Sequence, residues 1–244
     1  SLRSWGASGV DLFFVISGFV ITYSHLNHQK SFFDFLLARS IRIVPIYWFV
    51  ICVVFVLSRI INSSAFNSAP PSFVSLLESL FFLSGALSHH YPIVFVGWTL
   101  EFEMLFYIIF SLFMLSSKWS FNLIHLFLLL GLFAIFSKNL IIMEFFLGVL
   151  VGYYFHSFKI TKNFALTALI FGLILLVTSL NFQCNALIGR FFALGLPSVI
   201  ILIGAIFTYQ YQHDFFIFIG NASYSIYLIQ VMTIPVFFKI CQYF

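Results

Sequence analysis

A carboxylate with a hydroxyl group on either side stands in the apolar segment GWTLEFEMLFY, residues 97–107. On a helix, Thr99, Glu103 and Tyr107 share one face at four-residue spacing. Glu103 then lies roughly 9 Å beyond Gly97 along the helix axis. Such a carboxylate either organises hydrogen bonds or orients a reacting group and handles its proton, and the pattern leaves both open.

The second carboxylate of this segment, Glu101, points away from that face. Glu101 and Glu103 differ by about 200° around a helix, so they do not form a carboxylate pair for one site. Glu101 is nearer the end of the segment, and we expect it to be solvated or paired with an arginine. Trp98 leads the segment.

Two arginines three residues apart, Arg39 and Arg42, lie in the segment ARSIRIVPIYW, residues 38–48. On a helix they share a face, and two guanidinium groups can clamp phosphates in paired hydrogen bonds. The pyrophosphate of coenzyme A is such a group. The alternative is an anchor at the cytoplasmic membrane surface, assisted by Trp48.

The segment GVDLFFVISGF, residues 9–19, carries an acidic residue at the start of an apolar helix. Asp11 opens this helix, and Ser17 and Gly18 offer a small notch one to two turns later. The alternative for Asp11 is an N-terminal carboxylate that the helix dipole stabilises near water.

Three hydroxyl-bearing residues, Ser223, Tyr224 and Tyr227, lie in the segment GNASYSIYLIQ, residues 220–230. On a helix, Ser223 and Tyr227 share a face. They belong to a site or pack as polar contacts between helices. The seven histidines and three cysteines have no metal-ligand spacing, so we expect neither a metal site nor a disulfide framework.

Composition defines the elements that must position these residues. Of 244 residues, 62% are hydrophobic and 7% are charged, against roughly 25% charged in a soluble domain. Because so few polar side chains cannot cover a water-facing surface, the chain is predicted to be an all-α, polytopic integral membrane bundle. The net charge of +4 comes from few residues, and we expect no nucleic-acid partner.

Eight stretches are apolar and long enough to be predicted as spanning helices. They cover residues 10–25, 41–61, 97–116, 121–137, 140–157, 164–181, 190–209 and 217–238. A further apolar stretch, 73–85, is too short to span and is predicted to be interfacial or re-entrant. We see no internal repeat and no soluble domain, so residues 1–244 are expected to form one membrane domain.

Basic residues near helix ends predict the orientation. If the linker from His25 to Ile41 is cytoplasmic, Lys159 and Lys162 face the cytoplasm as well. This topology puts the paired arginines at the inner side and both Asp11 and Glu103 in the outer half of the membrane.

Taken in order, five segments closely resemble the type-3 membrane acyltransferase family, above all its exopolysaccharide and O-antigen acetyltransferase branch. They are GVDLFFVISGFVIT, ARSIRIVPIYW, GWTLEFEMLFY, MEFFLGVLVGY and GNASYSIYLIQ. The resemblance extends over nearly the whole chain. Members have about ten spanning helices and pass an acyl group, usually acetyl from coenzyme A, to a sugar hydroxyl in the bacterial inner membrane.

The resemblance implies roles for several residues. Arg39 and Arg42 match the family's paired arginines on the acyl-CoA side, and Glu103 matches the acidic residue of the tryptophan-led motif. The early motif, which lines the core, contains Asp11. The resemblance thus makes Glu103, Asp11 and Tyr107 catalytic candidates and the arginines donor-binding candidates. The remaining motif positions, lining the core or the acceptor, are Ser17, Gly18, Trp98, Thr99, Ser223, Tyr224 and Tyr227.

The chain also departs from the family pattern. The family's first helix carries a basic residue and, further along, a histidine thought to be catalytic, and this chain begins after that point. The last motif ends in Gln230 where many relatives have histidine. We therefore expect the family's first and last helices to be missing here, and acyl transfer to need what they contribute.

The sequence therefore predicts an O-acyltransferase, O-acetyl in the first instance, that acts on a lipid-linked or surface polysaccharide such as an exopolysaccharide or lipopolysaccharide O-antigen. Acetyl-CoA or another acyl-CoA serves as donor substrate, and no cofactor is bound permanently. Two alternatives remain. In a transporter or flippase component, the intramembrane carboxylates would relay protons or bind cargo. An inactive scaffold would pair with a full-length relative.

Overall fold

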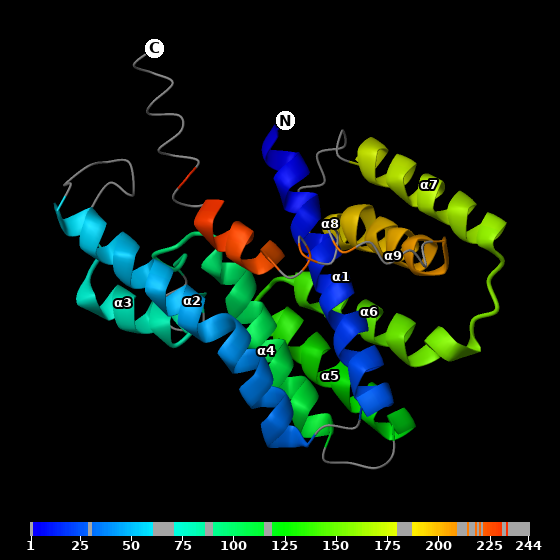
Figure 1. The fold of residues 1–244 in the computed structure, drawn as a ribbon, viewed down its shortest axis with the longest axis horizontal. Helices are drawn as coiled ribbons and strands as arrows, with labels where there is room; N and C mark the ends of the chain where they lie inside the picture. Colours follow the sequence, from blue (N-terminus) through cyan, green and yellow to red (C-terminus); the bar gives the residue numbers. More distant parts are fainter. Residues whose placement is uncertain are drawn as a thin grey trace. The chain divides into compact units, whose positions relative to one another are not determined.

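Every regular element in the described part of the chain is a helix. The computed structural model describes residues 2–28, 31–60, 71–85, 90–114, 119–179, 187–208, 214, 218, 220, 222–230 and 233. Its α-helices are α1 (Leu2–His28), α2 (Phe32–Ile60), α3 (Phe73–Leu80), α4 (Gly97–Phe113), α5 (Trp119–Phe136), α6 (Met143–Tyr154), α7 (Lys162–Ser179), α8 (Leu187–Arg190) and α9 (Leu196–Thr208). Within these ranges there is no strand, so the all-α prediction is confirmed (Figure 1).

Five helical stretches are long and apolar enough to cross a membrane. They are Ser8–His28, Phe32–Arg59, Leu140–Ser157, Lys162–Ser179 and Phe191–Thr208. Helix α4, with 17 residues, and the apolar run Leu123–Phe136 are shorter. Of the predicted span 217–238, the structure describes residues 218, 220, 222–230 and 233. The number of eight spans therefore stays a prediction.

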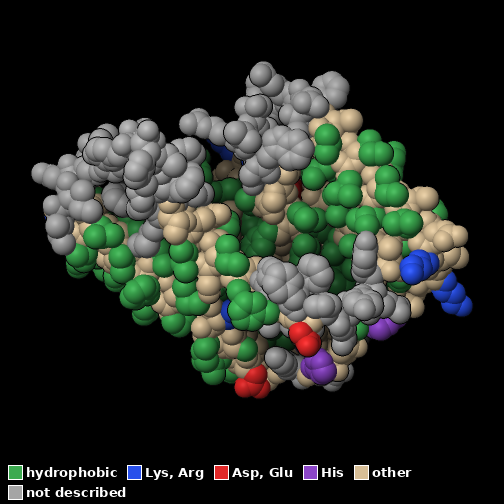
Figure 2. Space-filling view, turned by 45° about the horizontal axis from the view of Figure 1, so that its top comes forward, with side chains coloured by type: hydrophobic (Ala, Val, Ile, Leu, Met, Phe, Trp, Pro, Cys, Tyr) green, Lys and Arg blue, Asp and Glu red, His purple; other side chains and the backbone are tan. Residues whose placement is uncertain are grey.

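Apolar side chains cover much of the outer surface, as expected for contact with lipid. Figure 2 shows hydrophobic side chains spread over the visible face, with few charged ones among them. On α7, the exposed fractions of Phe164 and Phe171 are 64% and 55%. A helix that is apolar on its exposed faces has its natural solvent in the hydrocarbon core of a bilayer.

One local prediction was wrong, and another was correct only in part. The segment from His25 to Ile41 is not a linker, because α1 continues to His28 and α2 begins at Phe32. Helix α2 begins at Phe32, nine residues before the predicted start at 41, so Arg39 lies two turns inside a helix. The apolar stretch 73–85 does not span, as expected, but only Phe73–Leu80 is α-helical, and Phe82 follows with a positive φ of 60°.

The described residues group into two compact units. The first comprises residues 1–32 and 108–211, and the second comprises 33–107 and 212–244. Each buries its own polar side chains.

In the first unit, glycines allow helices to approach closely. Helix α1 crosses α6 (Figure 1) at Gly18 and Gly148, where an added Cβ would overlap a carbonyl oxygen of the facing helix. Gly148 and Gly152 form a GxxxG pattern, which is typical of tight helix packing in membranes. Gly204 packs in the same way, bringing α9 against α7 at Leu169.

In the second unit, hydrogen bonds from α2 and α4 hold the α3 region. The indole nitrogen of Trp48 donates to the Leu80 carbonyl at 2.9 Å, at the end of α3. Glu101 accepts the backbone N–H groups of Ser84 at 3.0 Å and Gly85 at 2.9 Å. Glu101, expected to be solvated or paired with an arginine, is partly exposed, and its carboxylate binds the backbone that follows the positive-φ turn.

Candidate functional site

The centre of the candidate site in the second unit is a buried carboxyl group on α4. The side chains of Glu103 and Tyr107 are 4% and 3% exposed. Because they are four residues apart on one helix, the Tyr107 hydroxyl reaches Glu103 and donates a hydrogen bond to its Oε1. The other oxygen, Oε2, is buried and has no hydrogen-bond partner within the described part of the chain. One oxygen of Glu103 is thus positioned and the other remains able to accept.

The paired arginines of α2 lie beside this carboxyl group. The Arg39 guanidinium is 5.7 Å from the centre of the Tyr107 ring, within the range of a cation–π contact. Phe35, one turn earlier on α2, packs edge-on against the same ring. Both Arg39 and Arg42 act electrostatically on Glu103. Arg39 is half-buried and Arg42 is exposed.

This arrangement contradicts one part of the predicted topology, the separation of the arginines at the inner side from Glu103 in the outer half of the membrane. The two come together because α2 starts at Phe32. Arg39 therefore lies inside the helix and beside Tyr107, which is nearly three turns beyond the start of α4 at Gly97.

Two tyrosines of the last motif tie this arrangement together. The Tyr224 hydroxyl donates to the Ile43 carbonyl at 2.9 Å, on α2 directly after Arg42. The Tyr227 hydroxyl lies 2.9 Å from the Thr99 hydroxyl, near the start of α4. The helical residues 222–230 therefore connect the helix that carries the arginines with the helix that carries Glu103. Both tyrosine hydroxyls bind residues more than 100 positions away in the sequence, and they link helices in this way.

Some motif residues do not join Glu103. Although Thr99 shares a helix face with Glu103, its hydroxyl donates to the Val96 carbonyl at 2.9 Å. Trp98 packs edge-on against Phe102. Ser223 is exposed, and its hydroxyl donates to the Gly220 carbonyl at 2.7 Å.

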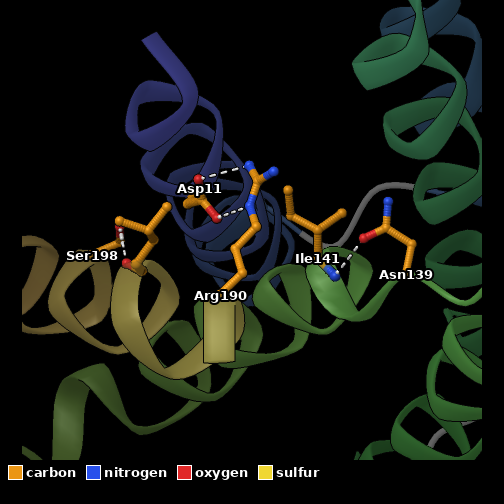
Figure 3. A network of polar contacts seen from close by, with 6 residues as sticks. Asp11, Asn139, Ile141, Arg190 and Ser198 are labelled. Atoms are coloured by element: carbon orange, nitrogen blue, oxygen red, sulfur yellow. Dashed lines mark hydrogen bonds and ion pairs between the residues drawn. The ribbon is translucent and has the colours of Figure 1, made fainter. Parts of the chain in front are cut away.

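Asp11 belongs to the first unit and has a basic partner there. It is fully buried, and its oxygens accept from Arg190 Nε at 3.4 Å and Nη2 at 3.2 Å. Figure 3 shows the two side chains pointing toward each other from α1 and the end of α8. The reading of Asp11 as a solvated N-terminal carboxylate was wrong. In the same unit Ser17 is half-buried, and Gly18 is a helix-packing position.

Sequence reasoning missed two charged residues near Asp11, which are Glu144 and Arg190. Glu144 occurs in the segment MEFFLGVLVGY but was not singled out, although an acidic residue inside an apolar run was the available signal. Arg190 was not singled out either. Among the described residues, no group of three His, Cys, Asp or Glu side chains is arranged to hold a metal ion.

Comparison with known proteins decides the family. A model of the acyltransferase domain family (Acyl_transf_3) matches residues 1–244. The chain belongs to this acyltransferase family. The acyltransferase is similar to "Exopolysaccharide production protein ExoZ" of Rhizobium meliloti (strain 1021), with 32% identity over 96% of this chain and 78% of that protein. No solved structure matches it. The resemblance drawn from the five motifs is thereby confirmed, and the chain is an acyltransferase of the helical membrane type.

For an acyltransferase, the cluster in the second unit combines two useful properties. Guanidinium groups recognise anionic oxygens, and a buried carboxylate with an unused oxygen can accept a proton or orient a hydroxyl group. The exposed Arg42 and half-buried Arg39 are accessible from outside the helix pair, whereas Glu103 is not. The arginines are thus suited to binding and Glu103 to action at short range.

Proposed function

We propose that this chain transfers an acyl group, acetyl in the first instance, from acyl-CoA to a hydroxyl group of an exopolysaccharide or its lipid-linked precursor, at the bacterial inner membrane. The observation that carries the proposal is the position of Arg39 and Arg42 near the buried Glu103 in one unit, with the Arg39 guanidinium over the ring of Tyr107. The name of the relative from Rhizobium meliloti supports the polysaccharide as acceptor.

In this proposal the arginines bind the donor. Coenzyme A carries phosphate groups, and two guanidinium groups on one helix face give paired, charge-assisted hydrogen bonds to them. Arg39 is also held over the Tyr107 ring, which limits the freedom that binding would otherwise remove. Loss of either arginine should therefore weaken donor binding before it affects the chemical step.

Glu103 acts on the acceptor in this proposal. The acceptor oxygen attacks the thioester carbon, the carbon–sulfur bond breaks, and the hydroxyl proton ends on the coenzyme A sulfur. Because a sugar hydroxyl is a weak nucleophile at neutral pH, it needs a nearby base or orienting acceptor. The unused Oε2 of Glu103 is such an acceptor, and the hydrogen bond from Tyr107 fixes the carboxyl group.

The test uses the protein with any flanking helices that its gene encodes, reconstituted in lipid bilayers. Radiolabelled acetyl-CoA and lipid-linked exopolysaccharide precursor are supplied, and label in the glycan is measured. We expect Arg39→Ala to raise KM for acetyl-CoA by about tenfold or more, as loss of one charge-assisted contact predicts. Glu103→Gln should lower kcat by about 100-fold or more, the scale of general base catalysis.

Arg59→Ala is the matched control. Arg59 lies on the same helix, but its guanidinium donates to the Pro71 carbonyl at 2.9 Å and packs over Phe55. We expect this variant to keep the wild-type KM. Turnover by Glu103→Gln at the wild-type rate would remove Glu103 from the chemistry. Absence of any label in the glycan, with cargo movement instead, would replace acyl transfer by transport.

A further inference from the structure

Three charged side chains meet in the interior of the first unit. Asp11 comes from α1, Glu144 from the first turn of α6, and Arg190 from the end of α8. Both carboxyl groups are 0% exposed, whereas the Arg190 side chain is 37% exposed. A buried charged group in a membrane protein is unfavourable in free energy, so it normally has a partner of opposite charge or hydrogen-bond donors.

The hydrogen bonds of this cluster are unevenly shared. Arg190 directs both Nε and Nη2 at the two oxygens of Asp11 (Figure 3). Both oxygens of Glu144 are buried and have no hydrogen-bond partner among the residues that the structure describes. An ionised carboxylate can only accept hydrogen bonds, and no described donor is directed at Glu144.

Two described neighbours on the segment Phe191–Thr208, Gly195 and Ser198, direct no donor at Glu144. On one side it packs against Gly195, where an added Cβ would stand 3.1 Å from Glu144 Oε1, and a glycine has no side chain to donate. Gly195 ends the π-helical turn Phe191–Gly195, and Ser198, one turn further on, uses its hydroxyl on the Leu194 carbonyl at 2.7 Å.

The charges do not balance if both carboxyl groups are ionised. Among the described residues, the charged groups that act on Glu144 are Asp11 and Arg190, so two ionised carboxylates would stand beside one guanidinium group. An uncompensated buried charge costs several kcal/mol, and two carboxyl groups that share a site normally hold one proton between them. A protonated Glu144 is also a hydrogen-bond donor, and Asp11 is the acceptor beside it.

We propose that Asp11, Glu144 and Arg190 form a proton-binding site inside the first unit, in which Glu144 carries one proton and shares it with the ionised Asp11. Arg190 neutralises the charge of Asp11. The ligand of this site is the proton itself, and the site is independent of the reaction proposed above.

Infrared spectroscopy of the full chain in lipid bilayers at neutral pH tests this directly, because the C=O stretch of a protonated carboxyl group is separate from those of carboxylates and amides. Glu144→Gln is the informative variant, since its amide keeps the size and the donor of the protonated acid. We expect it to fold, and the wild-type minus variant spectrum to contain a protonated-carboxyl band worth one group per chain. This band should shift in deuterated water and after ¹³C labelling of glutamate.

Asp11→Asn tests the pair from the other side and keeps the inference falsifiable if Glu144→Gln does not fold. With Asp11 neutral, Glu144 is the one carboxyl left beside Arg190, so it should ionise and the same band should disappear. Glu78→Gln, on α3 of the other unit, should leave the band unchanged. A spectrum in which neither Glu144→Gln nor Asp11→Asn removes a protonated-carboxyl band, or in which ¹³C labelling of aspartate rather than glutamate shifts it, would overturn the proposal.

Discussion

The close approach of α1 and α6 makes Gly148→Ala a sharp test of the fold. A Cβ at Gly148 would overlap the carbonyl oxygen of Val15 and stand 2.9 Å from the backbone nitrogen of Phe19. Both are backbone atoms of α1, so no side-chain rotation relieves the contact, and the two helices must move apart. The rings of Phe14 and Phe145, stacked 4.4 Å apart, would lose contact as well.

The size of the effect follows from two opposing terms. Overpacking a well-packed interior costs about 1–3 kcal/mol, and a backbone clash belongs at the upper end. Replacing glycine by alanine within a helix gains about 1 kcal/mol from backbone propensity. The net loss for Gly148→Ala is therefore about 2 kcal/mol. Gly131 on α5 is the matched control, since a Cβ there meets nothing within 4 Å, and Gly131→Ala should show the propensity gain alone.

The assay is equilibrium unfolding of the full chain in mixed micelles of mild detergent and sodium dodecyl sulfate, followed by tryptophan fluorescence. The two alanine variants should differ by about 3 kcal/mol in the free energy of unfolding, which is more than a hundredfold in the equilibrium constant. If Gly148→Ala unfolds at the same detergent fraction as Gly131→Ala, the close packing of α1 on α6 is not present in the folded protein.

Three further substitutions test the polar contacts. Tyr107→Phe removes the hydroxyl that fixes Glu103, and we expect kcat in the acetyl-transfer assay to fall by about tenfold with KM unchanged, as loss of one positioning hydrogen bond predicts. Tyr224→Phe releases α2 from residues 222–230, so KM for acetyl-CoA should rise more than kcat falls; an unchanged KM would show that the link does not position the arginines. Arg190→Ala leaves Asp11 buried without its partner. Because Arg190 is partly exposed and screened, we expect a loss of about 1–3 kcal/mol in the unfolding assay, with part recovered on adding Asp11→Asn.

The helices and their apolar character were predictable from the sequence because length and composition determine them. The contact between Glu103 and Tyr107 was also predictable, since four-residue spacing on one helix brings side chains together without help from the rest of the fold. The start of α2 was not predictable in this way. Charges between residues 25 and 41 suggested a linker, whereas α2 already begins at Phe32.

The contacts between helices could not be predicted from the sequence. Arg190 and Asp11 are 179 positions apart, and Tyr224 and Ile43 are 181 apart. A single sequence gives periodicity within a helix but no information about which face of one helix meets which face of another. Glu144 was missed for a related reason: its importance comes from its neighbours on α1 and α8, and in the sequence it is one acidic residue at the start of an apolar run.

The hydrogen-bond and charge partners of Glu103 and Glu144 distinguish two kinds of buried carboxyl group. Glu103 has one oxygen fixed by a tyrosine, a second oxygen unused, and two accessible arginines acting on it. Glu144 has no described donor on either oxygen and shares its single cation with Asp11. An accessible cation beside a carboxylate can bind an anionic substrate. Two fully buried carboxyl groups that share one cation favour the binding of a proton. Glu103 and Glu144 should therefore respond differently to a neutral substitution. Glu103→Gln should lower turnover. Glu144→Gln should keep the fold, because its amide resembles the protonated acid, and should remove the protonated-carboxyl band, because it has no carboxyl group.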